Sequence, residues 1–250
     1  MAVIFPRWTN WLPLVVLAKV AFGGIAVVGA VWYWFSPEYT DVGYAPVQPV
    51  PFSHKFHAGE LGLDCRYCHY TVEKSSYAAI PPTSVCMGCH QKMSFPKDSK
   101  GKYNIKHPKL APLLKSVKTG KPLKWVRVHM LPDYAFFNHK VHVAAGVGCA
   151  SCHGRIDKME VVSQKKPLSM SWCLDCHRNP NKHLRPRNQV TNMSWDAKKA
   201  GYDPTKDATR ANREDIKRLR LAIKNGETFR QVDHKKVVVN PPEHCSGCHR

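Results

Sequence analysis

The sequence predicts a fold with little regular secondary structure, in which short helices and loops surround bound groups, preceded by one N-terminal transmembrane helix. Three observations predict this fold. A Cys-x-x-Cys-His motif occurs five times in 250 residues, and one long apolar run lies before residue 36. Nineteen prolines and fifteen glycines interrupt most other stretches, so a large core of regular elements is not expected,.

The five motifs predict what the bound groups are. In such a motif the two thiols add to the vinyl groups of one haem, and the adjoining histidine becomes the proximal ligand of its iron. The sequence therefore predicts a multihaem cytochrome c with five covalently bound haem c groups. Attachment is expected at Cys65, Cys68, Cys86, Cys89, Cys149, Cys152, Cys173, Cys176, Cys245 and Cys248, and proximal ligation at His69, His90, His153, His177 and His249.

Zinc held by Cys-x-x-Cys pairs is the alternative interpretation of these motifs. Random placement of ten cysteines and fourteen histidines gives about 0.02 motifs of this kind, and the five present use every cysteine,. Zinc does not need a histidine directly after every second cysteine, and an odd number of pairs would leave one unmatched. The pattern therefore favours c-type haem over zinc.

The motifs belong to a repeat. Residues 52–90 and 137–177 each hold a His-x-x-His pair followed by two motifs, and residues 232–250 hold a truncated copy. The first histidine of each copy lies 10 or 11 residues before its cysteine and is expected to be the distal ligand of that haem. The second histidine is expected to reach the next haem. The expected distal ligands are thus His54, His139 and His234, then His57 and His142, with His129 in reserve.

One methionine offers a different ligand. Met170 lies three residues before Cys173, where it can replace a histidine on one haem and raise the potential of that haem, or simply pack beside it,.

Residues 1–36 are predicted to form a transmembrane anchor. Residues 14–35 carry a single charge, Lys19, and a helix of this length crosses a hydrocarbon layer of about 30 Å,. Tryptophans lie at both ends of the run, as in an aromatic belt. A cleaved signal peptide is the competing interpretation, but the apolar run is longer than such peptides usually have.

The rest of the chain is expected outside the cytoplasm. Residues 37–51 contain four prolines and are predicted to form an extended tether, and residues 52–250 form the haem domain,. Covalent haem attachment takes place on the outer side of the bacterial inner membrane. We therefore expect a single-pass protein of that membrane with a periplasmic haem domain.

Charge narrows the choice of partners. The formal net charge is +20, and ten haem propionates would remove about half of it,. The remainder suits anionic lipid or an acidic redox partner, and no nucleic-acid-binding motif is present. The lysine-rich residues 91–123 are interpreted as a solvated surface loop or as a docking surface for such a partner.

Two regular elements are expected away from the motifs. Alternating residues at 123–130 predict a strand, and apolar residues at helical spacing within 207–225 predict an amphipathic helix,.

The His-x-x-His pair before Cys-x-x-Cys-His is similar to the small multihaem cytochromes of the c3/c7 type. The N-terminal anchor, PFSHKFHAGELGLDCRYCH, RVHMLPDYAFFNHKVHVAAGVGCASCHG and PLSMSWCLDCHR together resemble the pentahaem cytochrome subunit of alternative complex III, a bacterial quinol:acceptor oxidoreductase. The resemblance covers roughly residues 1–180 well. It implies an iron–sulfur subunit of the molybdopterin-enzyme kind, polytopic quinol-binding membrane subunits, and a monohaem cytochrome c or terminal oxidase as partners.

The expected function is electron transfer without bond chemistry in this chain. The resemblance implies that electrons from quinol oxidised elsewhere in the complex pass through the five haems to a periplasmic cytochrome c or an oxidase. A pentahaem nitrite reductase normally needs a Cys-x-x-Cys-Lys motif, which the sequence lacks. The stronger alternative is a self-sufficient, membrane-anchored quinol dehydrogenase of the NapC/NrfH kind, which would oxidise quinol at its own first haem.

Overall fold

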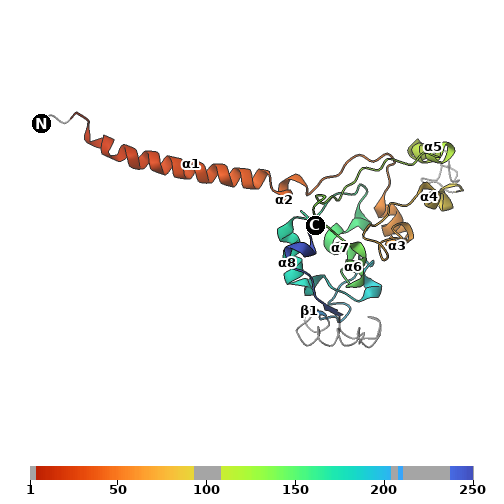
Figure 1. Ribbon diagram of the computed structural model, residues 1–250. Coiled ribbons are helices and arrows are strands. Elements are labelled where there is room, and N and C mark those ends of the chain that lie inside the picture. Colours follow the sequence, from red (N-terminus) through yellow and green to blue (C-terminus); the bar gives the residue numbers. More distant parts are fainter. Residues whose placement is uncertain (1–3, 93–107, 204–207, 211–236, 250) are drawn as a thin grey trace.

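The computed structural model of the chain describes residues 4–92, 108–203, 208–210 and 237–249. Figure 1 shows a long N-terminal helix, α1 (Leu12–Trp34), leading to a body of short helices joined by loops. This arrangement confirms the predicted fold class. Short helices predominate because Pro and Gly recur between the motifs and stop regular elements.

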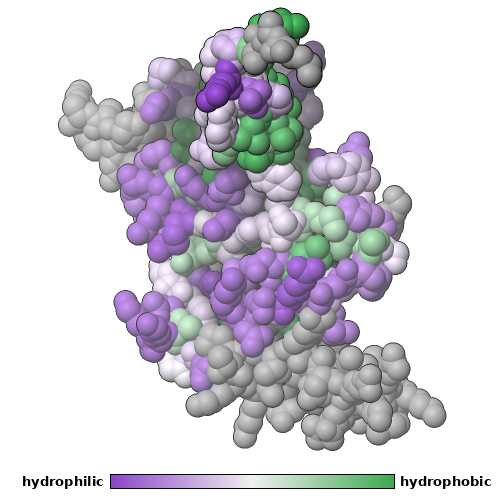
Figure 2. All heavy atoms as spheres, turned by 90° about the vertical axis from the view of Figure 1, so that its left-hand side faces the viewer, coloured by the Kyte–Doolittle hydropathy of each residue, from purple (hydrophilic) through white to green (hydrophobic). Residues whose placement is uncertain are grey.

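Helix α1 has the properties of a membrane span. Together with the preceding turn it covers Arg7–Trp34, 28 residues that include an 18-residue window with a mean hydropathy of 2.3, so by length and composition it can cross a membrane,. Pro37 follows shortly and opens the short helix α2 (Pro37–Thr40). Rings of Tyr33, Trp34 and Tyr39 cluster at this junction with centroids 4.8–5.6 Å apart. Figure 2, viewed from the side of α1, shows hydrophobic surface gathered at the top and a largely hydrophilic body below.

Four of the five motifs lie in short helices. These are α3 (Cys65–Cys68), α4 (Thr83–His90), α7 (Cys149–His153) and α8 (Met170–Arg178), while the fifth motif begins in a 3-10 turn, Cys245–Gly247. A helical turn brings residues i, i+3 and i+4 to one face, so both thiols and the histidine can meet one ligand. Side chains cap two of these helices: Asp64 accepts from the Arg66 N–H, and Ser169 from the Trp172 N–H,.

The His-x-x-His segments are also helical, but they differ in form. Residues Lys55–Glu60 form a π-helical turn, whereas the second copy begins the α-helix α6 (His139–Ala144). A π-helical turn is rare and is frequently found at functional sites. The remaining helix, α5 (Ala111–Thr119), ends at Gly120, whose φ of +67° gives the left-handed cap that glycine adopts without strain,.

The structure corrects the strand expected away from the motifs and describes only the first residues of the expected helix. Residues 123–130 form no strand and instead run beside the tether, where the Gln48 side chain donates to the Val126 carbonyl (2.8 Å) and accepts its N–H (3.0 Å). The start of the expected helix at 207–225 is a strand, β1 (Ala208–Arg210), parallel to β2 (Val237–Val239). The rest of that segment lies outside the described residues.

The side-chain core is small. Among the described residues, five hydrophobic side chains are buried: Val50, Val72, Leu113, Leu184 and Val190. Leu184 and Val190 lie behind the loop that enters α7, because Val147 pairs with Leu184 and the Cys149 N–H donates to the Val190 carbonyl (3.1 Å). The core therefore supports the third motif directly.

Candidate haem-binding site

Four pairs of histidine rings face each other across gaps of nearly equal size. In each pair a histidine of the His-x-x-His segment opposes a histidine that ends a Cys-x-x-Cys-His motif. The ring centroids are 6.0–6.5 Å apart in the pairs His54–His69, His57–His90, His139–His153 and His142–His177. In the first and third pairs the ring planes differ by 3° and 9°. The structure thus brings together eight of the residues that the repeat nominated.

The spacing of the pairs fits one metal ion between two imidazoles. A histidine nitrogen binds a first-row metal at about 2 Å, so two such bonds plus the distance from each nitrogen to its ring centroid give about 6 Å between centroids. A direct contact between two rings would be shorter. Each pair is therefore suited to hold a haem iron from both sides, with the motif thiols alongside for covalent attachment.

Hydrogen bonds orient most of these rings. The Nδ1 atoms of six histidines lie 2.6–3.2 Å from backbone carbonyl oxygens, which can only accept, so each Nδ1 carries the proton and donates. Nε2 is then the nitrogen with a free lone pair, as a metal ligand needs. The donor and acceptor residues are His57 and Ser53, His69 and Ala79, His139 and Ser76, His142 and Asn138, His177 and Pro242, and His249 and Tyr134.

The first and third pairs each contain a histidine whose surroundings favour neutral imidazole. Burial, followed by the nearby His69 and His57, lowers the pKa of His54 to about 4. Burial also lowers the pKa of His153 to about 3, with neighbouring histidines, His129 first, as the further cause. A neutral imidazole is the form that ligates a metal, so both side chains are ready to bind near neutral pH. Their Nδ1 atoms are buried and have no hydrogen-bond partner within the described residues.

The same aromatic packing supports both His-x-x-His segments. Phe52 stacks on His57 (centroids 4.3 Å apart) and meets His54 edge to face (4.9 Å). Phe137 does the same to His142 (4.4 Å) and His139 (4.8 Å). One phenylalanine therefore holds both histidines of its segment in each copy, and the agreement to 0.1 Å supports the repeat at the level of side-chain geometry.

The other candidate ligands are placed differently. The His129 ring lies edge-on to His153 with centroids 4.5 Å apart and planes 85° apart, so no metal-sized gap separates the two. Met170 is 60% exposed, and His142 already opposes the proximal histidine of its motif. His234 lies outside the described residues. The neighbour of the His249 ring is Tyr134, at 5.8 Å.

The arrangement of the side chains does not match a zinc site. In the part of the chain that the structure describes, no three side chains of His, Cys, Asp or Glu converge as a metal site would require,. Four of the five motifs instead place their histidine opposite an imidazole of a His-x-x-His segment, which is the arrangement for a metal held in a flat macrocycle.

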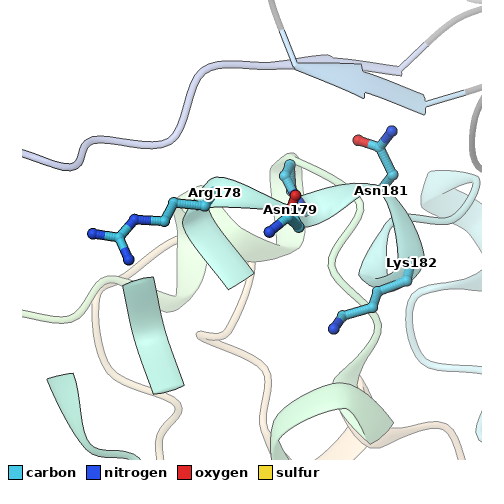
Figure 3. A pocket seen from close by; sticks show the side chains of 5 residues that line it. Arg178, Asn179, Asn181 and Lys182 are labelled. Carbon is cyan, nitrogen blue, oxygen red and sulfur yellow. The ribbon is translucent and has the colours of Figure 1, made fainter. Parts of the chain in front are cut away.

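A shallow depression follows the fourth motif but has no features of a substrate site. Residues 178–182 line it, with a volume of about 290 Å³, and Figure 3 shows Arg178 and Lys182 at opposite ends of the labelled side chains. Both cations are already paired: Arg178 with Glu243 at 3.5 Å and Lys182 with Asp175 at 3.4 Å.

Sequence reasoning missed the groups that orient the ligands. The carbonyl partners of His57 and His142 lie four residues upstream and follow from helical geometry once a helix is expected. The partners of His139 and His177 are 63 and 65 residues away, so no local pattern identifies them. The two phenylalanines could have been predicted, because Phe52 and Phe137 occupy matching positions of the repeat.

Cysteine pairs, adjoining histidines and opposed imidazoles define a c-type cytochrome with several haems. Comparisons with known proteins agree. The family model for cytochrome c7 and related cytochrome c matches residues 135–215, and that for the class III cytochrome C family matches residues 36–112.

A curated relative shows the family. Over 205 residues the chain is 32% identical to the menaquinone reductase multiheme cytochrome c subunit of Nitratidesulfovibrio vulgaris, an alignment that covers 70% of this chain and 89% of that protein. The chain belongs to this family of multihaem cytochromes c, which bind haem covalently and transport electrons.

Proposed function

We propose that the chain is the electron-transfer subunit of a membrane quinol:electron acceptor oxidoreductase and carries five covalently bound haem c groups. The observation that carries this proposal is the set of four opposed histidine pairs, each beside a Cys-x-x-Cys-His motif. Haem iron with two imidazole ligands supplies reversible one-electron chemistry when bound. Such an iron has no open position for a substrate, so the chain itself performs no bond chemistry.

Each iron is assigned a pair of protein ligands. The first four irons take the opposed pairs described above. The fifth takes His249, whose Nδ1 donates to the Tyr134 carbonyl (3.2 Å), and His234, which keeps the 11-residue spacing to Cys245. His129 is the second candidate for the distal position of the fifth iron.

The partners follow from the resemblance and from the relative. The proposed complex has the composition of alternative complex III, with an iron–sulfur subunit, polytopic quinol-binding subunits, and a monohaem cytochrome c or terminal oxidase as acceptor. The relative's name, a menaquinone reductase, favours a second candidate of the same class, in which electrons run toward quinone. In both cases α1 anchors the chain in the inner membrane, residues 37–51 tether it, and residues 52–250 lie in the periplasm.

The test separates a dependent subunit from a self-sufficient quinol dehydrogenase. The holoprotein is expressed alone in membranes, a menaquinol analogue is added, and haem reduction is followed optically. We expect no rapid reduction until the partner subunits are restored. Rapid reduction without them, blocked by a quinol-site inhibitor, would show that the chain has its own quinol site and would overturn the proposal.

A further inference from the structure

The first and third motifs lie against each other although 84 residues separate their first cysteines. The Cys65 thiol reaches the Thr191 carbonyl (3.9 Å), and the Cys149 N–H donates to the neighbouring Val190 carbonyl (3.1 Å). The His139 N–H and Nδ1 both bond to the Ser76 carbonyl, at 3.1 and 2.9 Å. These contacts join the two complete copies of the repeat through the first and third haem sites.

The fourth and fifth motifs are joined in the same way. The His177 Nδ1 donates to the Pro242 carbonyl (2.6 Å), and Arg178 pairs with Glu243. Both acceptors lie just before the fifth motif. Burial, and then the nearby Cys86, raises the pKa of Cys68, so the first and second motifs lie close together. Burial, and then the nearby Cys176 and Cys173, raises the pKa of Cys152, so the third and fourth motifs do too. These contacts give the order second, first, third, fourth, fifth.

Exposure of the cysteines agrees with this order. Among the ten cysteines two are exposed, Cys89 of the second motif and Cys245 of the fifth. These motifs are the two ends of the row, while the third motif, at its centre, contains His153, whose Nδ1 atom is buried. Figure 1 shows α4 and α5 at the end of the molecule opposite α1, whereas the fifth motif (dark blue) lies beside α8 on the side nearer α2.

The outer end of the row is surrounded by positive charge. Helix α5 contacts α4, which carries the second motif. Five exposed lysines lie on α5 or in the segments that follow α4 and α5, and we call them the α5 basic surface: Lys92, Lys115, Lys118, Lys121 and Lys124. Residues 108–132 contain no Asp or Glu. Within the described residues, no ion pair neutralises any of the five lysines, whereas the cations beside the fourth motif are paired.

The arrangement on α5 presents charge outward. Leu113 and Ser116 are buried on one face, and Lys115 and Lys118 project from the other,. The Ser116 hydroxyl donates to the Lys121 carbonyl (2.6 Å), which holds the chain after α5 against the helix. Fixed, unpaired charges of one sign steer an oppositely charged partner and raise its association rate.

We infer that the second haem site is the outer end of the electron path, and that the α5 basic surface is the docking surface for an acidic, soluble electron-transfer protein. The inference deepens the proposed function and rests on it, because it says where electrons leave the row. A protein partner is favoured over anionic lipid because the surface lies at the end of the molecule farthest from the membrane helix in Figure 1.

The test uses the purified holoprotein with its anchor, in neutral detergent, and cytochrome c with succinylated lysines as an acidic probe. Binding is measured calorimetrically at low and high salt, and contacts are identified by carbodiimide cross-linking and mass spectrometry. The double variant Lys115→Glu, Lys118→Glu is compared with Lys198→Glu, Lys199→Glu, which changes the net charge equally at another exposed site.

We expect the α5 variant to weaken probe binding at least tenfold at low salt, the control to change it less than twofold, and cross-links to fall on the α5 basic surface. Equal losses in both variants would mean that bulk charge attracts the probe and would overturn the inference. Unchanged binding in the α5 variant would do the same. Binding to phosphatidylglycerol vesicles is measured on the same variants. An α5 variant that loses vesicle binding but keeps probe binding would also overturn the inference.

Both measurements are made on oxidised protein without turnover. Rapid haem reduction by quinol in the chain alone would therefore contradict the proposed function but would not affect the docking result. Failure to find docking at the α5 basic surface would contradict the inference but not the proposed function.

Discussion

At the scale of single residues, the opposed histidines make the sharpest prediction. His54→Ala and His139→Ala should each remove one distal imidazole and open one iron to water, turning about a fifth of the haem high-spin. Electron paramagnetic resonance of the oxidised holoprotein measures this fraction. His183→Ala is the control, because that half-buried ring opposes no motif histidine among the described residues. A wholly low-spin spectrum in either of the first two variants would contradict the ligand assignment.

The fifth iron gives a second prediction. His234→Ala should produce one high-spin haem, since its spacing to Cys245 matches that of His54 to Cys65. His129→Ala should leave all five low-spin, because its ring lies edge-on at 4.5 Å from His153 with no gap for a metal. Electron paramagnetic resonance spectra of the two oxidised variants test both expectations. The reverse result would assign the distal position to His129.

The repeat made the opposed histidines predictable. Spacing alone nominated His54, His57, His139 and His142 and paired each with a motif, and the ring geometry agrees with those pairings. The groups that orient the rings could not be found this way. A backbone carbonyl has no sequence signature, so the role of Ser76 or Pro242 appears only when the chain is folded.

At the scale of elements, the loop entering α7 is tightly constrained. Gly148 packs against Arg185, and a Cβ at Gly148 would overlap the Arg185 guanidinium. Arg185 cannot move freely, because its Nη1 donates to the Asn192 carbonyl (3.0 Å) and its guanidinium lies 4.9 Å from the Trp195 ring centroid. Overpacking of this kind costs about 1–3 kcal/mol.

Gly148→Ala should therefore lower the yield of protein with a third haem, measured as the ratio of five-haem to four-haem species by intact mass. Gly88→Ala is the matched control. It also adds a methyl group to a glycine beside a haem attachment site, but the nearest heavy atom to the new Cβ is the Tyr67 hydroxyl at 3.7 Å, an ordinary contact. Equal yields from both variants would show that the Arg185 contact does not support haem attachment.

Elements without motifs were predicted less well. Alternation at residues 123–130 indicated a strand, but the segment pairs with a glutamine side chain of the tether instead of another strand. Alternation of apolar and polar residues indicates which side chains face the protein. An extended segment that lies against another loop shows the same alternation as a strand. The short strand β1 lies at the start of the segment where a helix was expected, and its partner, β2, lies too far along the sequence for a local pattern to identify the pairing.

At the scale of the whole molecule, the anchor and the haem domain should be separable. Helix α1 has no buried residue, and the elements that it contacts most are the turn before it and α2. Residues 37–250 exported behind a cleavable signal should therefore remain in solution and keep the visible spectrum of the full chain. Ultracentrifugation and haem quantitation check both points. Loss of haem from the truncated protein would mean that the anchor contributes to the fold.

The intact mass of the full holoprotein gives the last prediction. It should exceed the 28.3 kDa chain by five haem increments, since five complete motifs are present. The small side-chain core is the physical reason to expect that the fold depends on them: five buried hydrophobic side chains in the described residues are few for a chain of this length,. A form lacking one increment but retaining full stability would contradict that dependence.

The hydrogen bonds that orient the histidines also set an order of maturation. In the proposed periplasmic location the chain crosses the membrane N-terminus first, so the Ser76 carbonyl that orients His139 crosses 63 residues before it. The acceptor of His177, Pro242, crosses 65 residues after it. The third site can therefore close as His139 emerges, whereas the fourth site must wait for Pro242, and a chain stalled between His177 and Pro242 would carry a finished third site beside an unfinished fourth.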